Sequence, residues 1–225
     1  MSVRRVARFR LGIAFLAANL TLCAGVIPVL NPSFELGAGG TPLTNSLYSY
    51  DTTTQPYGWT ITQGNLEVIQ TGYAGNWVVQ AGSYSVDMNG VGAGNTILTQ
   101  TISGFTPGAT CMLTFGLAAN PSWCNSPSSA CSLQVSIGGV TQDYANIWQS
   151  VMVFADQTFL FTPSASSTML SFTDTTNGGG NGGPAIDNIR IADAPSGVSE
   201  PASTLLLLCG LGTLTALAKK RRQFV

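Results

Sequence analysis

Short stretches of alternating apolar and polar residues are the feature that most limits what this chain can fold into. In residues 132–138 every second residue is Leu, Val or Ile, with Ser or Gln between them. A period of two is typical of a half-buried β-strand, and Gly138-Gly139 offers a tight hairpin turn directly after it. Apolar residues elsewhere in the central part of the chain also alternate and do not recur at helical spacing.

The alternation, broken by Gly, Thr, Ser and Asn, predicts roughly nine short antiparallel strands. They are expected at residues 58–62, 66–70, 84–88, 97–102, 111–117, 132–138, 157–161, 168–174 and 185–191. Turn-rich connections between so many short strands indicate an all-β fold, an antiparallel β-sandwich of the jelly-roll type. The segment 37–56 is expected to be a long loop, either a binding loop or surface cover.

The beginning of the chain has the pattern of a secretory signal peptide. Four arginines precede an apolar run at residues 11–22, and the small residues Cys23-Ala24-Gly25 follow. We expect residues 1–25 to be removed as a signal helix, with cleavage after Ala24 or Gly25. Lipidation of Cys23 is disfavoured because Leu22 is large, and the Arg4-Arg5 pair lacks the rest of a twin-arginine pattern.

The end of the chain combines three parts in a fixed order. Ser199-Glu200-Pro201 is followed by an apolar run at residues 202–218 and by a basic cluster at residues 219–222. The run is just long enough for a transmembrane helix, and its basic end should stay on the cytoplasmic side. One interpretation is an ordinary single-pass anchor.

The order of these parts also resembles the PEP-CTERM sorting signal of Gram-negative bacteria, with Ser199 where the usual motif has its first Pro. That resemblance implies recognition by an exosortase, removal of the tail near Glu200-Pro201, and export to the cell surface or extracellular matrix. We therefore divide the chain into a signal peptide (1–25), a β-sandwich domain (26–195) and a sorting signal (196–225).

Charge and composition exclude several classes of function. Between the two ends, Arg190 is the single basic residue and stands against nine acids. Nucleic-acid binding is disfavoured because it needs clustered Lys or Arg. The chain contains no histidine, which removes the usual Ser-His and Cys-His nucleophile pairs and imidazole metal sites. A glycoside hydrolase that uses only carboxylates is still compatible with this composition, and Glu67 and Asp87 are its candidate acids.

The cysteines suggest one disulfide. Cys124 and Cys131 flank a Pro- and Ser-rich loop and are expected to pair in an oxidising compartment. Cys23 is expected to leave with the signal peptide, and Cys209 lies in the apolar tail. Cys111 is expected to be a buried thiol, although a different pairing of Cys111 stays open.

Several motifs occur in order over residues 29–191. They are Asn31-Pro32-Ser33-Phe34-Glu35, Gly58-Trp59-Thr60, Gly64-Asn65-Leu66-Glu67, residues 82–90, Leu117-Ala118-Ala119-Asn120-Pro121 and Gly183-Pro184-Ala185-Ile186-Asp187-Asn188-Ile189. Together they resemble the DUF642 and choice-of-anchor C group, whose domains are similar to galactose-binding-like carbohydrate modules. The resemblance implies a non-catalytic β-sandwich associated with surface or wall polysaccharide.

Glu35 and Asp187 are the candidate metal ligands. Asp187 has the strand parity of Ile189 and Ile191, so its carboxylate should start a row that faces the core, where an unpaired acid is costly. By resemblance, Glu35 and Asp187 would hold a structural Ca²⁺, with backbone carbonyls completing its coordination. The alternative is that Asp187 accepts backbone hydrogen bonds at the end of a strand.

Aromatic faces and planar polar side chains are the groups that bind sugars. Tyr73, Asn76 and Trp77, in a Gly-rich segment, are the candidate ligand-binding residues, whereas Trp59 is expected in the core. The leading hypothesis is an exported, non-enzymatic β-sandwich that binds extracellular polysaccharide. The alternatives are a structural or adhesive surface protein without sugar binding, and the carboxylate-based hydrolase.

Overall fold

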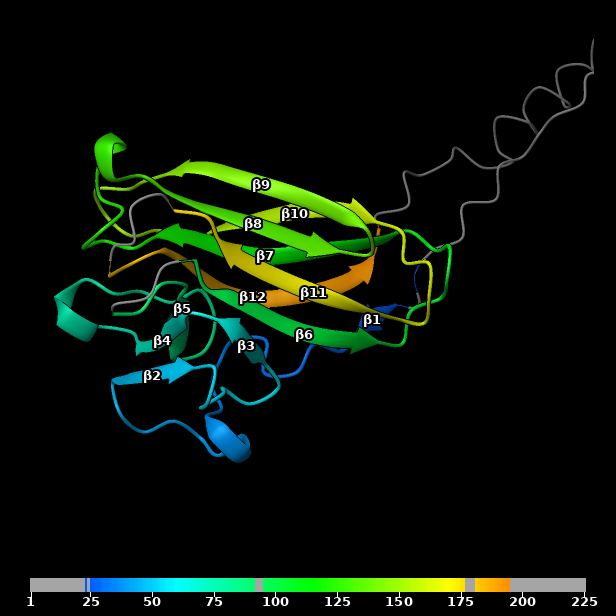
Figure 1. Ribbon diagram of the computed structural model, residues 1–225, viewed down its shortest axis with the longest axis horizontal. Coiled ribbons are helices and arrows are strands. Elements are labelled where there is room, and N and C mark those ends of the chain that lie inside the picture. Colours follow the sequence, from blue (N-terminus) through cyan, green and yellow to red (C-terminus); the bar gives the residue numbers. More distant parts are fainter. Residues whose placement is uncertain (1–22, 24, 92–94, 177–180, 195–225) are drawn as a thin grey trace, which may run out of the picture.

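The computed structural model describes residues 23, 25–91, 95–176 and 181–194 as two antiparallel β-sheets packed face to face (Figure 1). Most of the expected signal peptide and the whole sorting signal, with Ser199, Glu200 and Pro201, lie outside the described residues. Within the described part, no helix is long and apolar enough to cross a membrane.

The larger sheet has seven strands in the order β10-β7-β12-β5-β4-β2, with β1 beside β12. Their bounds are β1 Val26–Ile27, β2 Leu47–Asp51, β4 Asn65–Gln70, β5 Tyr84–Asp87, β7 Cys111–Ala119, β10 Ala155–Phe161 and β12 Pro184–Asp193. The smaller sheet has the order β3-β6-β11-β8-β9, with β3 Thr60–Gln63, β6 Ile97–Ser103, β8 Cys131–Ile137, β9 Val140–Ile147 and β11 Ser167–Asp174. Three short 3-10 turns are η1 Ala38–Gly40, η2 Tyr73–Gly75 and η3 Pro127–Ser129.

This architecture confirms the predicted antiparallel β-sandwich. From β6 onward the chain mostly crosses between the sheets after each strand, as jelly rolls do. All nine expected strands are present, and three more were not expected. One of these, β2, lies inside the segment expected to be a loop.

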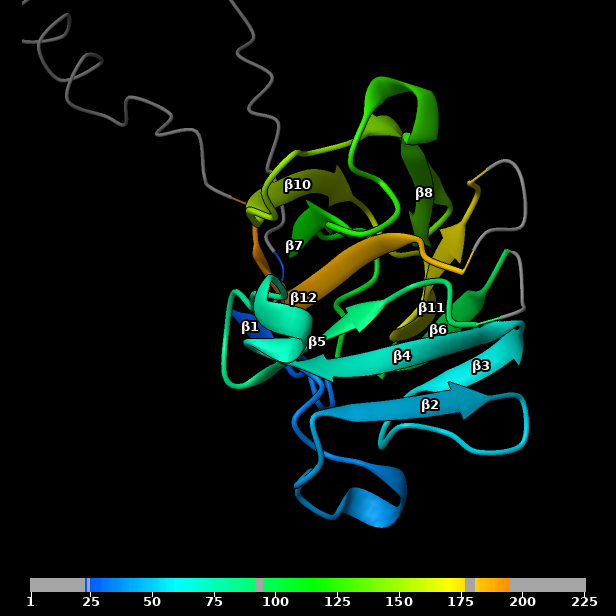
Figure 2. The same ribbon diagram turned by 90° about the vertical axis from the view of Figure 1, so that its left-hand side faces the viewer.

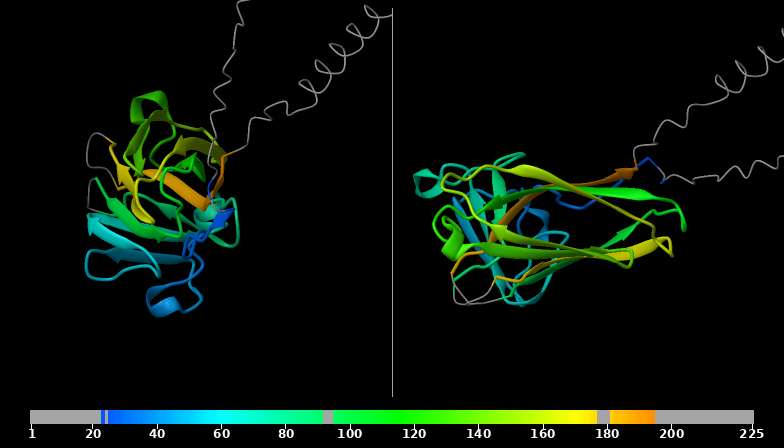
Figure 3. Two further views of the ribbon diagram at one scale, coloured as in Figure 1. Left: turned by 90° about the vertical axis from the view of Figure 1, so that its right-hand side faces the viewer. Right: turned by 90° about the horizontal axis from the view of Figure 1, so that it is seen from above.

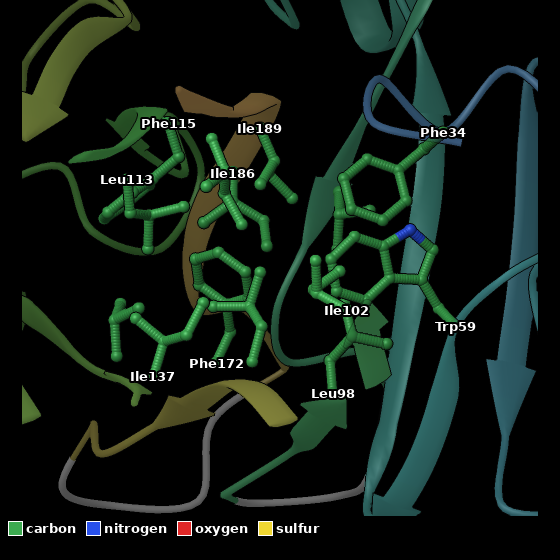
Figure 4. Close-up of a cluster of buried hydrophobic side chains, with 14 of the residues drawn as sticks. Phe34, Trp59, Leu98, Ile102, Leu113, Phe115, Ile137, Phe172, Ile186 and Ile189 are labelled. Atoms are coloured by element: carbon green, nitrogen blue, oxygen red, sulfur yellow. The ribbon is translucent and has the colours of Figure 1, made fainter. Parts of the chain in front are cut away.

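A run of aromatic rings passes through the core between the sheets, among Leu and Ile side chains (Figure 4). Ring centroids lie 5.4 Å apart for Phe34 and Trp59, and 6.1 Å apart for Trp59 and Phe172. Phe115 continues the run at 5.2 Å from Phe172 and 5.5 Å from Tyr144. Trp59 is therefore a core residue, as its sequence context predicted, and aromatic contacts tie both sheets together.

The β8–β9 hairpin shows why one strand was missed. Gly138 and Gly139 have φ of 59° and 80°, the left-handed values that a two-residue type I′ turn requires. The following strand, β9, is at the edge of its sheet, and many of its side chains are exposed on both faces. Its sequence therefore lacks the alternation that marks a half-buried strand.

The cysteine pairing differs from the expectation at Cys111. The structure pairs Cys111 with Cys23, with their Cα atoms 5.1 Å apart, and pairs Cys124 with Cys131 at 5.5 Å. Cys111 is thus not a free thiol. Cys23 is buried in the main core, and the Gly25 amide donates to the Asp193 carboxylate, so this end of the chain is fixed along β12.

We expect the Cys111→Ser variant to lose about 2–5 kcal/mol of unfolding free energy, because the bond closes a loop with a sequence separation of 88 residues. Cys124→Ser opens a loop of separation 7 and should cost less. Urea unfolding of both variants measures the difference. Titration of a free Cys111 thiol in the unfolded, unreduced protein would contradict this pairing.

Candidate functional site

A β-bulge in β12 decides where Asp187 points. Asp187 lies opposite Gly116, but the next paired residue, Arg190, lies opposite Thr114, so β12 has one extra residue. Asn188 takes up the bulge with a left-handed φ of 53°. Ile186 and Ile189 therefore both face the core, whereas Asp187 faces the outer surface of the seven-stranded sheet. The parity argument that placed Asp187 in the core row was wrong because it assumed a regular strand.

Asp187 and Glu35 hold the backbone of the same short segment. Asp187 Oδ2 accepts hydrogen bonds from the amides of Gln80 and Ala81 at 2.7 and 2.9 Å. Glu35 Oε1 accepts from the amides of Ser83 and Tyr84 at 2.8 and 3.0 Å. The two carboxylates thus converge on residues 80–84 and anchor the loop 71–83 where it enters β5.

A glycine is required where this loop passes Glu35. Gly82 has a φ of 69°, and a Cβ at this position would collide with the Glu35 carboxylate. Gly82 thereby lets the loop backbone approach the carboxylate closely enough for its amides to bond. The loop, with η2 at its start, lies over the sheet beside β5 and β12 (Figure 2).

Trp77 fixes the middle of the loop 71–83 onto the sheet. Its ring packs in a cluster with Ile69, Ala118, Met152 and Ala185, and its Nε1 donates to Ser85 Oγ at 2.8 Å. Only 4% of Trp77 is exposed. Trp77 therefore lies under the loop, and the expectation that it offers an open aromatic face to a sugar is corrected.

Beside Trp77 lies a hollow of about 110 Å³, which we name the Tyr73–Trp123 hollow. Two aromatic residues on its rim are well exposed, Tyr73 at 37% and Trp123 at 46%. Its lining consists of Glu67, Ile69, Tyr73, Ala74, Asn76, Trp77, Asp87, Asn120, Ser122, Trp123 and Asn181. The structure thus brings the three sequence-predicted ligand residues to one place.

Asn120 positions the Trp123 side of the hollow. Its side-chain oxygen accepts from the amides of Ser122 and Trp123 at 2.8 and 3.2 Å, which shapes the turn after β7. Its amide nitrogen donates to Asp87 Oδ2 at 2.6 Å. Asn120 and Trp123 were not among the predicted site residues, although Asn120 belongs to a motif that the sequence already displayed.

Glu67 and Asp87 are direct cross-strand neighbours on β4 and β5. Asp87 is buried, and its Oδ1 also accepts from the amides of Asn89 and Gly183 at 3.1 and 2.7 Å. Burial raises the pKa of Asp87 well above its usual value, although these hydrogen bonds lower it. Burial also raises the pKa of Glu67. Asp87 therefore serves the framework, and Glu67, which is half-buried, is the carboxyl that a ligand can reach.

Glu35 and Asp187, the candidate metal ligands, are not fully used by hydrogen bonds to the described residues. Glu35 Oε2 accepts no hydrogen bond among the described residues, and Asp187 Oδ1 accepts one, from the Asn188 amide. Gln80 Oε1 is buried without a partner in the described part. Arg190, the only basic residue described, pairs with Asp156 at 2.8 Å, so neither acid has a cationic partner. Hard oxygen donors are the ligand type that Ca²⁺ prefers, but the described residues contain no group of three or more His, Cys, Asp or Glu side chains, so backbone carbonyls or water would have to supply most of the ligands.

We expect the metal-free protein to become less stable as the pH rises from about 4 to 7. Burial raises the pKa of Glu67, Asp87, Asp174 and Asp187, that of Asp187 to about 6. The folded state then binds more protons than the unfolded state, and the stabilisation present in acid is lost as these groups ionise. For Asp187 the loss is at most about 3 kcal/mol, spread between its unfolded value of 3.8 and about pH 6.

Urea unfolding in EDTA at several pH values measures the slope of unfolding free energy against pH. Asp187→Asn should flatten it, whereas Asp51→Asn should not, because hydrogen bonds from Thr53 and Thr54 lower the pKa of that exposed acid. Equal slopes for wild type and Asp187→Asn would contradict the account.

Comparison with known proteins places the chain by fold and by family. A cyclase from Fischerella sp. TAU in complex with 4-(1H-indol-3-yl)butan-2-one has a TM-score of 0.54 and 18% identity, covering 76% of this chain and 98% of the cyclase. TmCBM61 in complex with β-1,4-galactotriose has a TM-score of 0.50 and 11% identity, covering 75% of this chain and 99% of that chain. At this level of identity these likenesses show the fold alone, a β-sandwich.

A search of curated proteins found no significant match. Residues 28–192 match the family described as "Protein of unknown function (DUF642)", as the sequence motifs implied. Because this match spans most of the chain, the protein belongs to the DUF642 family.

Proposed function

We propose that this domain is a non-enzymatic, exported module that binds neutral polysaccharide at the Tyr73–Trp123 hollow. The observation that carries the proposal is the pairing of two exposed aromatic rings with acidic and amide side chains around one hollow. Sugar C–H faces pack on aromatic rings, while carboxylate and amide groups bond to hydroxyls. The hollow is small, so it would contact one sugar unit of a chain that lies across the surface.

The charge of the hollow favours a neutral glycan. Glu67 and Asp87 are the carboxylic acids among the described residues that line it, and none of these residues is Lys or Arg. A glycan rich in uronic acid would bring like charge to Glu67 without a compensating cation. The galactotriose complex of TmCBM61 makes β-1,4-galactan a reasonable first probe.

Two alternative functions are a glycoside hydrolase and a structural or adhesive surface protein. A hydrolase would use Glu67 and Asp87, but Asp87 is buried and occupied by three N–H donors, which disfavours a role as base or nucleophile. A structural or adhesive surface protein would associate with itself or with cells independently of sugar. Affinity gels separate this adhesive alternative from the proposal.

A structural Ca²⁺ held by Glu35 and Asp187 is part of the proposal. Bound there, the ion would offset the two neighbouring negative charges and fix the residue 80–84 segment that carries the site loop. Adding Ca²⁺ to the EDTA-treated protein should raise its melting temperature at pH 7, and an unchanged melting temperature would count against the metal.

Export is proposed from both ends of the chain. The tail with Ser199, Glu200 and Pro201 would be recognised by an exosortase in a Gram-negative cell, with the protein transiently anchored in the inner membrane. Because Cys23 is bonded to Cys111 and buried in the core, we place signal-peptide cleavage before Cys23 rather than after Ala24 or Gly25.

Replacing the exposed aromatics should weaken binding without unfolding the protein. We expect Tyr73→Ala and Trp123→Ala each to weaken binding to β-1,4-galactan about tenfold or more, because truncating an aromatic anchor of a binding site costs roughly 2 kcal/mol or more. Affinity gels loaded with neutral glycans, and with polygalacturonate as the acidic control, measure retardation of the exported protein. Tyr57→Ala is the matched control, since Tyr57 is 40% exposed but lines no part of the hollow.

Unchanged mobility of wild type across the whole neutral panel would overturn sugar binding. Self-association that no sugar inhibits would instead favour the adhesive alternative.

Mass spectrometry of the exported protein under non-reducing conditions tests its processing. The expected result is a Cys23-containing peptide linked to Cys111 and a C-terminus that lacks the apolar run and basic cluster. An intact C-terminal peptide through Val225 would favour the ordinary membrane anchor.

A further inference from the structure

A second and larger hollow lies at the open edge of the sandwich and has no part in the site described above. It has a volume of about 440 Å³ and is lined by Leu117, Ala118, Ala155, Gln157 and residues 143–149. We name it the edge groove. It lies where β9, the last strand of one sheet, faces β10, the last strand of the other (Figure 3, right, which looks onto this edge).

The buried cluster around Trp77 separates the two hollows. Trp77 lines the Tyr73–Trp123 hollow, and Ala118 lines the edge groove, while both pack in one cluster with Met152. The Val78 amide also donates to the Met152 sulfur at 3.5 Å, which ties the site loop to the segment between β9 and β10. A ligand in one hollow therefore does not occupy the other.

A bulge shapes the groove wall formed by β9. Tyr144 lies opposite Leu133, but Ile147 lies opposite Cys131, so β9 carries one extra residue. Asn146, within the bulge, has a left-handed φ of 57°. A bulge re-aims side chains and interrupts the regular edge that an added peptide strand would need. The groove is thus better suited to recognition by side chains than to strand addition.

The side chains of the groove have the chemistry of a glycan site. Trp148 is 44% exposed and offers an aromatic face. In the part of the chain that the structure describes, no hydrogen bond involves Trp148 Nε1, Tyr144 Oη or the Asn146 side-chain amide. Gln149, by contrast, is engaged by the backbone: its Oε1 accepts from the amides of Ala119 and Val153, and its Nε2 donates to the Val153 carbonyl.

The charge of the groove again favours a neutral ligand. Among the described residues that line it, Asp143 is the one carboxylic acid, and none is Lys or Arg. Uncommitted polar groups beside an aromatic face suit a chain rich in hydroxyls. The volume lies in the range of about 300–1,000 Å³ that ligand sites usually have.

We propose that the edge groove is a second contact site for neutral polysaccharide, independent of the Tyr73–Trp123 hollow. This inference rests on the proposed function, because the same class of ligand is involved. Two separate sites make one domain bivalent, so that it cross-links glycan chains and gains avidity of about 10²–10⁴ over one site. Cross-linking gives the protein an organising role in a polysaccharide matrix that a single site would not.

Calorimetric titration of the exported protein with short β-1,4-galactan oligosaccharides measures the number of sites, and turbidity with the long polymer measures cross-linking. Wild type should bind two oligosaccharides per chain and make the polymer turbid. Trp148→Ala should bind one and lose turbidity, Trp123→Ala should do the same, and the double variant should bind none. Trp148→Phe, which keeps an aromatic face, should retain most of the binding, and Tyr57→Ala should match wild type.

Wild-type stoichiometry and turbidity in a Trp148→Ala protein with an unchanged melting temperature would overturn the edge groove. One oligosaccharide per wild-type chain, lost completely in Trp123→Ala, would overturn the groove while leaving the proposed function intact. One oligosaccharide lost only in Trp148→Ala would overturn the Tyr73–Trp123 hollow instead and support the groove. No binding by any form would remove both proposals.

Discussion

The placement of the loop 71–83 depends on two carboxylates that accept hydrogen bonds from the backbone of one segment. Glu35 lies just after the N-terminal motif and Asp187 lies in the last strand, yet both accept amide hydrogen bonds from residues 80–84. Charge-assisted bonds of this kind are stronger than neutral ones, and here they join three distant parts of the chain. They hold the loop 71–83 over the sheet, and that loop carries Tyr73 to the hollow and buries Trp77 beneath it.

Beneath this anchor, the aromatic core makes the sandwich one unit. The run of rings from Phe34 to Tyr144 begins beside the Glu35 anchor and ends at the wall of the edge groove. Both proposed binding surfaces therefore rest on the same rigid core, which keeps the cost of ordering a binding site low. Because they lie on either side of the Trp77 cluster, a single domain carries two proposed binding surfaces.

Local pattern was sufficient to predict most of the strands and the family, because half-buried strands carry their alternation in the sequence. It failed where the local rule is broken. The bulge at Asn188 reversed the direction of Asp187, and the exposed edge strand β9 lacks alternation altogether. The local pattern also places Cys23 in the signal peptide. Its pairing could not be predicted because Cys111 lies 88 residues away and only the fold brings the two cysteines together.

The candidate site, too, could be predicted only where its residues are close in sequence. Tyr73, Asn76 and Trp77 are close in sequence and could be chosen from composition, but burial of Trp77 depends on Met152 and Ala185, which are distant in sequence. Trp123 and Glu67 join Tyr73 only through the pairing of β4, β5, β12 and β7. The order of strands in the sheet brings together loops that are far apart in sequence, and no local motif predicts that arrangement.

The four tryptophans allow one direct measurement of the central claim, that neutral glycan binds at the exposed aromatic rims. In an NMR titration of the ¹⁵N-labelled protein with β-1,4-galactan oligosaccharides, each indole N–H gives one signal. We expect the Trp123 signal to shift with ligand concentration while that of Trp59, buried in the core, stays in place. A titration in which the Trp123 signal does not move at saturating oligosaccharide would contradict it.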